Sequence, residues 1–144
     1  MNPLAGVVID TSTLVGAVLR PASIPRQVLL LAVKHFVLCV SQGTLHELQT
    51  VLHRPKFDRY APLQTRIDFL TLVTERARLT EVDAACTQTA QGICRDPKDD
   101  KFLALALACQ ATTIVSSDAD LLSLKSWQSI TIIKPADFLV MEKP

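Results

Sequence analysis

The chain has 144 residues, 49% of them hydrophobic and 20% charged, with a formal net charge of +1. This composition supplies a hydrophobic core and excludes disorder as the main state. No apolar run approaches the ~18–20 residues of a membrane helix, and residues 4–9 lack the basic region that precedes a secretory signal. The four cysteines show no C-x-x-C spacing, which is typical of reduced thiols, so we expect a cytoplasmic protein with no membrane association.

Short apolar runs alternate with segments of helical periodicity along the whole chain. The expected elements, in chain order, are a strand at 4–9, a helix at 25–34, a strand at 36–40, helices at 44–53 and 62–76, a short edge strand at 79–82, a helix at 98–109, and strands at 112–116 and 130–133. This alternation predicts an α/β sandwich with a mostly parallel central sheet. No repeat, linker or boundary interrupts it, so we expect one domain over residues 1–144.

The charges are distributed unevenly. Residues 20–66 hold seven Lys or Arg against two acids, whereas residues 81–120 hold seven acids against three bases. Ordinary scatter of surface charge is one explanation. The other is a basic surface beside an acidic pocket, which suits a site that holds cations and attracts a polyanion.

Acids follow or flank several of the expected strands. Asp10 ends the first strand, Asp118 and Asp120 follow the strand at 112–116, Glu47 lies early in the helix after the second strand, and Asp96, Asp99 and Asp100 begin the apolar helix. The carboxyl ends of parallel strands meet at one edge of a sheet, so these carboxylates are expected there together. Grouped carboxylates repel one another unless a cation compensates, and Mg²⁺ or Mn²⁺ prefers such oxygen ligands. Such a site is equipped for phosphodiester hydrolysis.

Each acid also has a purely structural explanation. Asp10 is a favoured N-cap, although the hydroxyls of 11–13 would cap equally well. Glu47 fits a capping box with Thr44, and Asp96 before a proline is a common N-cap and first-turn pair. One of Asp118 and Asp120 is expected to cap the helix that follows, and the other to serve the site.

Asp99 and Asp100 favour the helix dipole, but they point about 100° apart. Asp100 shares a face with Ala104 and Leu107, so Asp100 is expected to face the pocket and Asp99 the solvent or the rim.

The segments VVIDTSTLVGAVL, SQGTLHELQTVLHRPKF, DPKDDKFLALALA and IVSSDADLL, in this order and at these separations, resemble the PIN-domain family of metal-dependent ribonucleases. They resemble in particular the short, single-domain VapC-like proteins that act as toxins of toxin–antitoxin pairs. The resemblance implies a three-layer α/β/α sandwich with a mostly parallel sheet of about five strands. It also implies a four-acid site that binds Mg²⁺ or Mn²⁺ and cuts RNA.

Residue by residue, the resemblance assigns the four acids to Asp10, Glu47, Asp100 and Asp118. Asp10, Asp100 and Asp118 would hold the metal directly, and Glu47 would bind it or orient the attacking water. Thr11, Ser12 and Ser116 match the hydroxyl residues of the family pattern, and Asp99 and Asp120 are further candidates for support. Candidate contacts to RNA phosphates are Arg20, Arg26, Arg54, Lys56 and Arg59.

The expected function is therefore that of a Mg²⁺- or Mn²⁺-dependent endoribonuclease, the toxin of a toxin–antitoxin pair, with an antitoxin protein as partner. The alternative is a PIN-like module that binds RNA or protein without cutting. A mean hydropathy of +0.28 and the 62–76 helix leave more apolar surface than a monomer readily hides, and the family resemblance adds to the expectation of a homodimer.

Overall fold

The computed structural model describes residues 4–141, so the ends of the expected 1–144 domain lie outside the described residues. Its centre is a six-stranded sheet of order β3-β2-β1-β4-β6-β5. The strands are β1 (Gly6–Ile9), β2 (Val37–Val40), β3 (Arg78–Leu79), β4 (Ala111–Val115), β5 (Ser126–Trp127) and β6 (Ile130–Ile133). All neighbouring strands run parallel except β5, which pairs antiparallel with β6. The mostly parallel sheet is confirmed, with β5 as the strand that the sequence pattern did not predict.

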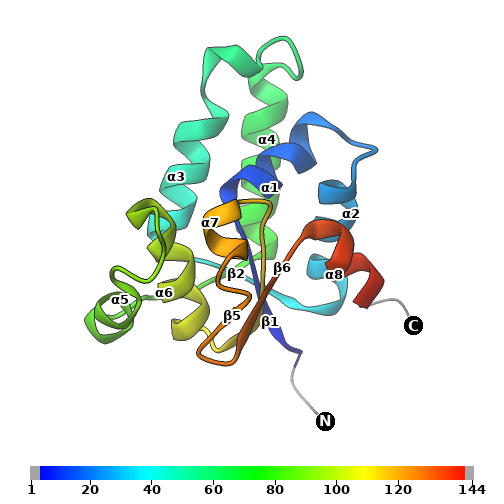
Figure 1. The fold of residues 1–144 in the computed structure, drawn as a ribbon. Helices are drawn as coiled ribbons and strands as arrows, with labels where there is room; N and C mark the ends of the chain where they lie inside the picture. Colours follow the sequence, from blue (N-terminus) through cyan, green and yellow to red (C-terminus); the bar gives the residue numbers. More distant parts are fainter. Residues whose placement is uncertain (1–3, 142–144) are drawn as a thin grey trace.

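Helices cover both faces of the sheet, as Figure 1 shows. One layer consists of α1 (Thr11–Leu19), α2 (Ile24–His35), α3 (Gln42–Leu52), α4 (Leu63–Arg76) and α8 (Pro135–Met141). The other consists of α5 (Ala84–Ala90), α6 (Asp100–Ala108) and α7 (Ala119–Leu122), and short 3-10 turns lie at Pro55–Phe57 and Pro97–Asp99. The three-layer α/β/α sandwich is thereby confirmed.

The strands form because their side chains are buried on both faces of the sheet. Val7 and Ile9 of β1 point into the core beneath α1, α2 and α8, and Val8 points into the core beneath α6. This alternation follows from the two-residue period of a strand. A strand buried on both faces reads as a continuous apolar run, which is why β1, β2, β4 and β6 were predictable.

The expected elements differ from the observed ones mainly at their ends. The expected helix at 44–53 begins earlier, at Gln42, because Ser41 is its N-cap and Thr44 is the third helical residue, completing the capping box from inside. The box therefore does not involve Glu47, and the Glu47 carboxylate makes its contacts outside α3. The expected edge strand at 79–82 is β3, at Arg78–Leu79.

Within the described residues, no single helix is long and apolar enough to span a membrane. Only when taken together do α1 and α2 reach that length and apolar composition, and the two helices are bent by 108° at the break between them.

Candidate metal centre

Asp10 stands at the carboxyl end of β1, beside the end of β4, and its backbone N–H donates to the Val115 carbonyl at 3.1 Å. The side chain is 3% exposed. Its carboxylate accepts hydrogen bonds from the Thr13 backbone N–H at 3.0 Å and from the Ser116 hydroxyl at 2.5 Å, with longer ones from Ser12. Burial raises the pKa of Asp10 above its ordinary value, and these hydrogen bonds oppose the rise. Asp10 thus caps α1 and also lies at the candidate site.

Ser116 links the first and last segments of the site. Its buried hydroxyl donates to Asp10 and accepts from the Asp118 backbone N–H at 2.9 Å. The Asp118 carboxylate in turn caps α7, accepting from the Asp120 backbone N–H at 2.7 Å through Oδ1. Of Asp118 and Asp120, Asp118 is therefore the residue that caps α7. It does so through Oδ1, and its Oδ2 takes no part in the cap.

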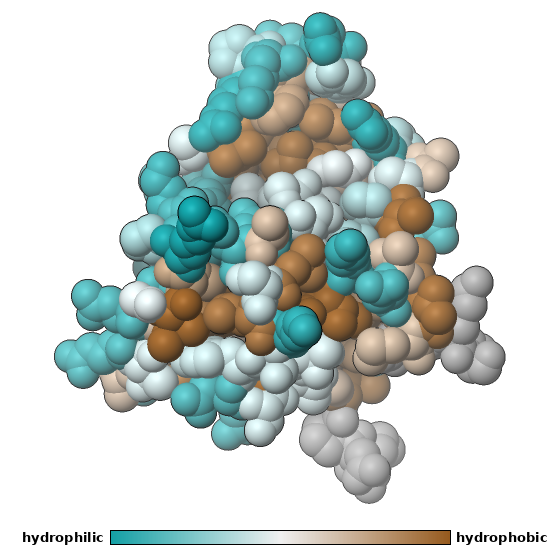
Figure 2. Space-filling model, in the orientation of Figure 1, coloured by the Kyte–Doolittle hydropathy of each residue, from teal (hydrophilic) through white to brown (hydrophobic). Residues whose placement is uncertain are grey.

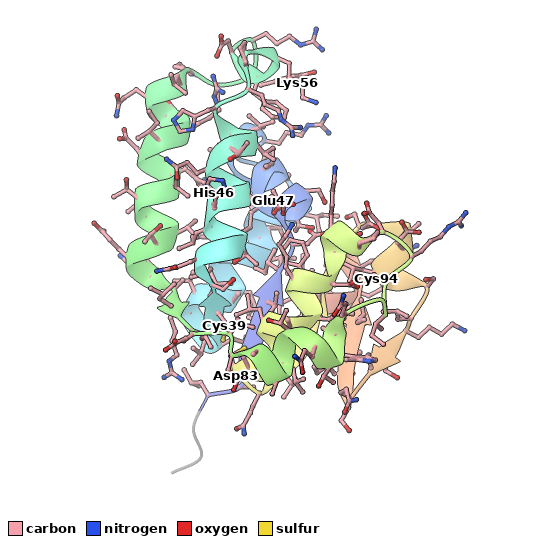
Figure 3. The ribbon with its side chains drawn as sticks, turned by 90° about the vertical axis from the view of Figure 1, so that its left-hand side faces the viewer. Cys39, His46, Glu47, Lys56, Asp83 and Cys94 are labelled. Atoms are coloured by element: carbon pink, nitrogen blue, oxygen red, sulfur yellow. The ribbon has the colours of Figure 1, made fainter. Side chains whose placement is uncertain are left out.

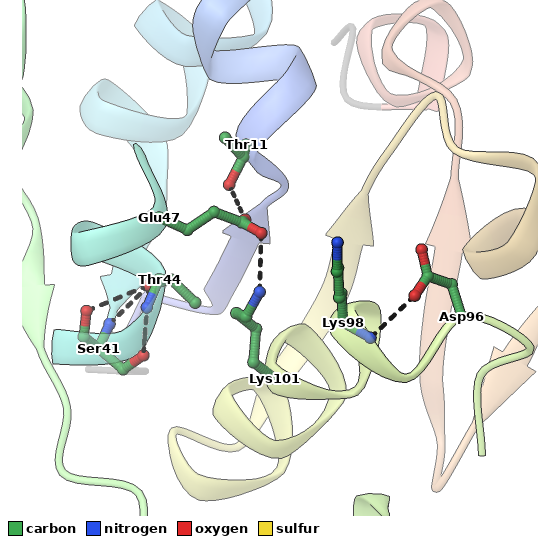
Figure 4. Close-up of polar contacts among 7 residues, drawn as sticks. All are labelled: Thr11, Ser41, Thr44, Glu47, Asp96, Lys98 and Lys101. Atoms are coloured by element: carbon green, nitrogen blue, oxygen red, sulfur yellow. Dashed lines mark hydrogen bonds and ion pairs between the residues drawn. The ribbon is translucent and has the colours of Figure 1, made fainter. Parts of the chain in front are cut away.

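Glu47 reaches the same edge from α3, as Figures 3 and 4 show. The Thr11 hydroxyl donates to its Oε2, and the Lys101 ammonium lies 2.7 Å from its Oε1. Lys101 was not predicted from the sequence. It lies 54 residues from Glu47 in the sequence, and a local sequence pattern cannot predict a contact over that separation.

The Asp99 side chain is surrounded by the negative charges of several other acids. Its Oδ2 atom is buried and has no hydrogen-bond partner among the residues that the structure describes. Partial burial, followed by the charges of Asp118, Asp96, Asp10 and Glu47, raises the pKa of Asp99 to about 7. Carboxylate oxygens of Asp96, Asp99 and Asp120 also lie within 4.8 Å of one another. An orphaned carboxylate oxygen among several acids fits a hard divalent cation such as Mg²⁺ or Mn²⁺.

The expected orientation of Asp100 is wrong. Its carboxylate accepts hydrogen bonds from the backbone N–H groups of Gly92 and Cys94, both at 2.8 Å. It therefore fastens the segment between α5 and α6, while Asp99 faces the other acids. The expectation assumed an α-helix from residue 98, but residues 97–99 form a 3-10 turn and α6 begins only at Asp100.

Asp96 both caps the 3-10 turn and lies in a group of acids. It caps the turn by accepting from the Lys98 backbone N–H at 3.0 Å (Figure 4), as the Asp-Pro pair predicted. It also belongs to the acidic group with Asp99 and Asp120, so the capping role does not exclude Asp96 from this edge of the sheet.

The basic candidates are divided between two environments. Arg26 is partly buried, and its Nε donates to the Ala17 carbonyl at 2.7 Å. Its guanidinium therefore caps a carbonyl in the last turn of α1. Arg54, Lys56 and Arg59 are exposed in the loop between α3 and α4, and Arg20 is exposed at the end of α1.

Replacing Asp99 with Asn is expected to stabilise the metal-free protein. Between about pH 4 and pH 7 the unfolded chain releases the Asp99 proton while the fold retains it, so wild-type stability falls as the pH rises through this window. At pH 8 the variant should be more stable by about 1–2 kcal/mol after solvent screening, or roughly 3–8 °C in Tm. Thermal unfolding in EDTA measures this gain, which should disappear near pH 3; equal Tm values at pH 8 would contradict the repulsion.

Residues 6–120 match the family model of the PIN domain. The chain belongs to the PIN domain family. This PIN domain is also 31% identical, over 120 residues, to an uncharacterized protein of Methanocaldococcus jannaschii, covering 83% of this chain and 74% of that protein.

Solved structures share the fold of this PIN domain at low identity. VapBC2 from Rickettsia felis, bound to a DNA fragment of its promoter, has a TM-score of 0.65 at 16% identity, over 90% of this chain and 98% of that one. VapC20 from Mycobacterium tuberculosis, a toxin that cleaves the sarcin-ricin loop, has a TM-score of 0.57 at 15% identity, over 87% and 98%. PAE2754 from Pyrobaculum aerophilum has a TM-score of 0.63 at 13% identity, over 95% and 88%. The expected membership of the PIN-domain family is confirmed, and solved VapC structures share the fold of this chain.

Proposed function

We propose that this PIN domain is a Mg²⁺- or Mn²⁺-dependent endoribonuclease. The proposal is supported chiefly by Asp10, Glu47 and Asp118, which hydrogen bonds link to the carboxyl ends of β1 and β4, and by Asp99, whose pKa their charges raise. Such a group of acids destabilises the fold unless a cation compensates, and within the described part of the chain one buried oxygen of Asp99 has no hydrogen-bond partner.

Asp10, Asp99 and Asp118 are the proposed direct ligands, and Asp99 takes the role that the motif assigned to Asp100. A bound divalent ion supplies a water of lowered pKa and neutralises charge on the leaving oxygen. Glu47, held by Thr11 and Lys101, is proposed to orient the attacking water. The Ser116 hydroxyl fixes the direction of the Asp10 carboxylate, as residues behind metal ligands do. Asp96 and Asp120 widen the acidic group beside Asp99.

RNA is the proposed substrate, and an antitoxin protein the proposed partner. The excess of basic residues over 20–66 suits a polyanion. Support for the toxin role comes from the VapC fold, since VapC20 is a sarcin-ricin-loop-cleaving toxin and VapBC2 is a complex bound to promoter DNA. A toxin that cuts cellular RNA would act in the cytoplasm.

Expression of the chain alone tests this function in cells, beside an Asp10→Asn variant at matched protein level. The wild-type chain should arrest growth and produce RNA fragments, whereas the variant should do neither. An equal arrest by both proteins would show that the acids do not carry the toxicity.

We also propose a homodimer. Apolar side chains remain exposed on α2 and α8, where Leu30 is 60%, Val140 71% and Met141 56% exposed. The helices α2 and α8 pack against each other, and Figure 2 shows hydrophobic surface on this side of the molecule. Light scattering is expected to give twice the chain mass at micromolar concentration, and Leu30→Lys should give the monomer. A wild-type monomer under these conditions would contradict the proposal.

A further inference from the structure

The loop between α3 and α4, residues 53–62, projects at the top of Figure 1, on the side of the sheet to which β1 delivers Asp10. Its Arg54, Lys56 and Arg59 side chains are exposed, and hydrophilic side chains cover this end of the molecule in Figure 2. The one acid in the loop sequence is Asp58, and its carboxylate pairs with the guanidinium of Arg66. The outward charge of the loop is therefore positive.

The buried Arg66 side chain of α4 fixes the conformation of this loop through hydrogen bonds to its backbone. It is 0% exposed, and it donates to the carbonyls of Leu52 at 2.6 Å, Ala61 at 3.1 Å and Arg54 at 3.1 Å. A buried guanidinium is costly unless such bonds satisfy it, so a loop that forms them is ordered before any ligand arrives. Preorganisation lowers the entropic cost of binding.

An aromatic side chain is presented on this loop among cations. Tyr60 is 47% exposed. The Arg59 guanidinium lies 4.8 Å from the Tyr60 ring centroid and donates to the Tyr60 hydroxyl at 2.6 Å. The hydrogen bond and charge of Arg59, with the charge of Arg20 from the end of α1, lower the pKa of Tyr60. Arg59 and Tyr60 therefore form a contact pair on the loop, and the charge of Arg20, from a second segment, acts on the same hydroxyl.

We propose that Arg20, Arg59 and Tyr60 form a binding site for single-stranded RNA outside the acidic centre. The Tyr60 ring would stack on a base, and the two guanidinium groups would contact phosphates. Aromatic rings beside arginines commonly bind single strands, because the ring stacks on a base. An acidic protein would bind through the arginines alone and would not use the exposed Tyr60 ring. This inference rests on the proposed function, since it names where the RNA substrate is held.

The loop lies close enough to the acidic residues for one RNA strand to contact both the loop and the acids. Glu47 lies five residues before the end of α3, so the loop begins roughly 7–8 Å farther along the helix axis. Figure 3 shows Lys56 beyond the end of the helix that carries Glu47.

Fluorescence anisotropy with a labelled single-stranded RNA oligonucleotide tests the site, with the full chain in EDTA so that no cleavage occurs. Tyr60→Ala should weaken binding by roughly 5- to 150-fold with an unchanged salt dependence. Arg59→Ala should weaken binding and reduce the slope of log affinity against log salt by about 0.7. Tyr60→Phe keeps the ring and should bind within a few-fold of wild type. Arg76→Ala, an exposed arginine at the other end of α4, is the matched control and should bind as wild type.

The proposal is overturned if Tyr60→Ala and Arg76→Ala bind RNA equally well. It is also overturned if poly-glutamate of equal charge displaces the RNA as effectively as unlabelled RNA, because the loop would then read charge alone and favour an acidic protein. Unfolding curves for each variant verify the fold. Because binding is measured without metal, a chain that binds RNA through Tyr60 but never cuts it would refute the proposed function and leave this inference intact.

Discussion

Replacing Asp99 with Ala is expected to abolish Mg²⁺-dependent RNA cleavage, whereas replacing Asp100 with Ala should leave cleavage measurable. Asp99 has a buried oxygen with no hydrogen-bond partner among residues 4–141 and faces the other acids, so its loss would remove one of the proposed direct ligands. Even supporting residues behind a metal cost 10–100-fold when lost, so a ligand should cost at least about 100-fold.

Asp100→Ala should instead lower stability. The change removes the acceptor of the Gly92 and Cys94 backbone N–H groups, each a bond to a charged group worth about 1.5–3 kcal/mol. Cleavage rates over a Mn²⁺ titration, with Tm measured on the same samples, separate the two effects. Loss of activity in a fully folded Asp100→Ala protein, with an active Asp99→Ala protein, would restore the assignment that the motif implied.

Asp10→Asn is expected to reduce RNA cleavage by at least about 100-fold with the fold retained. The amide keeps the shape of the side chain and can still accept from Thr13 and Ser116 through its oxygen, but it lacks the charge that a divalent ligand requires. Asp137→Asn, an exposed acid on α8, is the matched control and should cleave as wild type does. Similar rates for Asp10→Asn and wild type would remove Asp10 from the metal site.

The sheet and its acidic edge were predictable because both depend on short-range patterns. A strand buried on both faces must be apolar throughout, and the residue after it must stand at the edge; β1 followed by Asp10 and β4 followed by Ser116 obey both rules. The elements that were not predicted lack such a pattern. In α5, Ala90 is the buried residue, and β5 has two residues.

The direction of the Asp100 side chain shows where prediction from the sequence failed. Helical periodicity gives side-chain directions only inside a helix, and the Pro97–Asp99 turn ends at the residue in question. The direction of Asp100 is set by backbone N–H groups at Gly92 and Cys94, which any residue type could supply. The contact between Lys101 and Glu47 likewise depends on how α6 packs beside α3, which only the folded structure reveals.

The most direct test of the central claim is a cleavage assay on the purified chain. A structured RNA and a single-stranded RNA are incubated with the protein in Mg²⁺, in excess EDTA, and in EDTA followed by excess Mg²⁺. Four carboxylates that require a divalent ion predict fragments in the first and third reactions and none in the second. Fragments that persist in EDTA, or intact RNA in all three reactions with a folded protein, would contradict the assignment of this PIN domain as a metal-dependent ribonuclease.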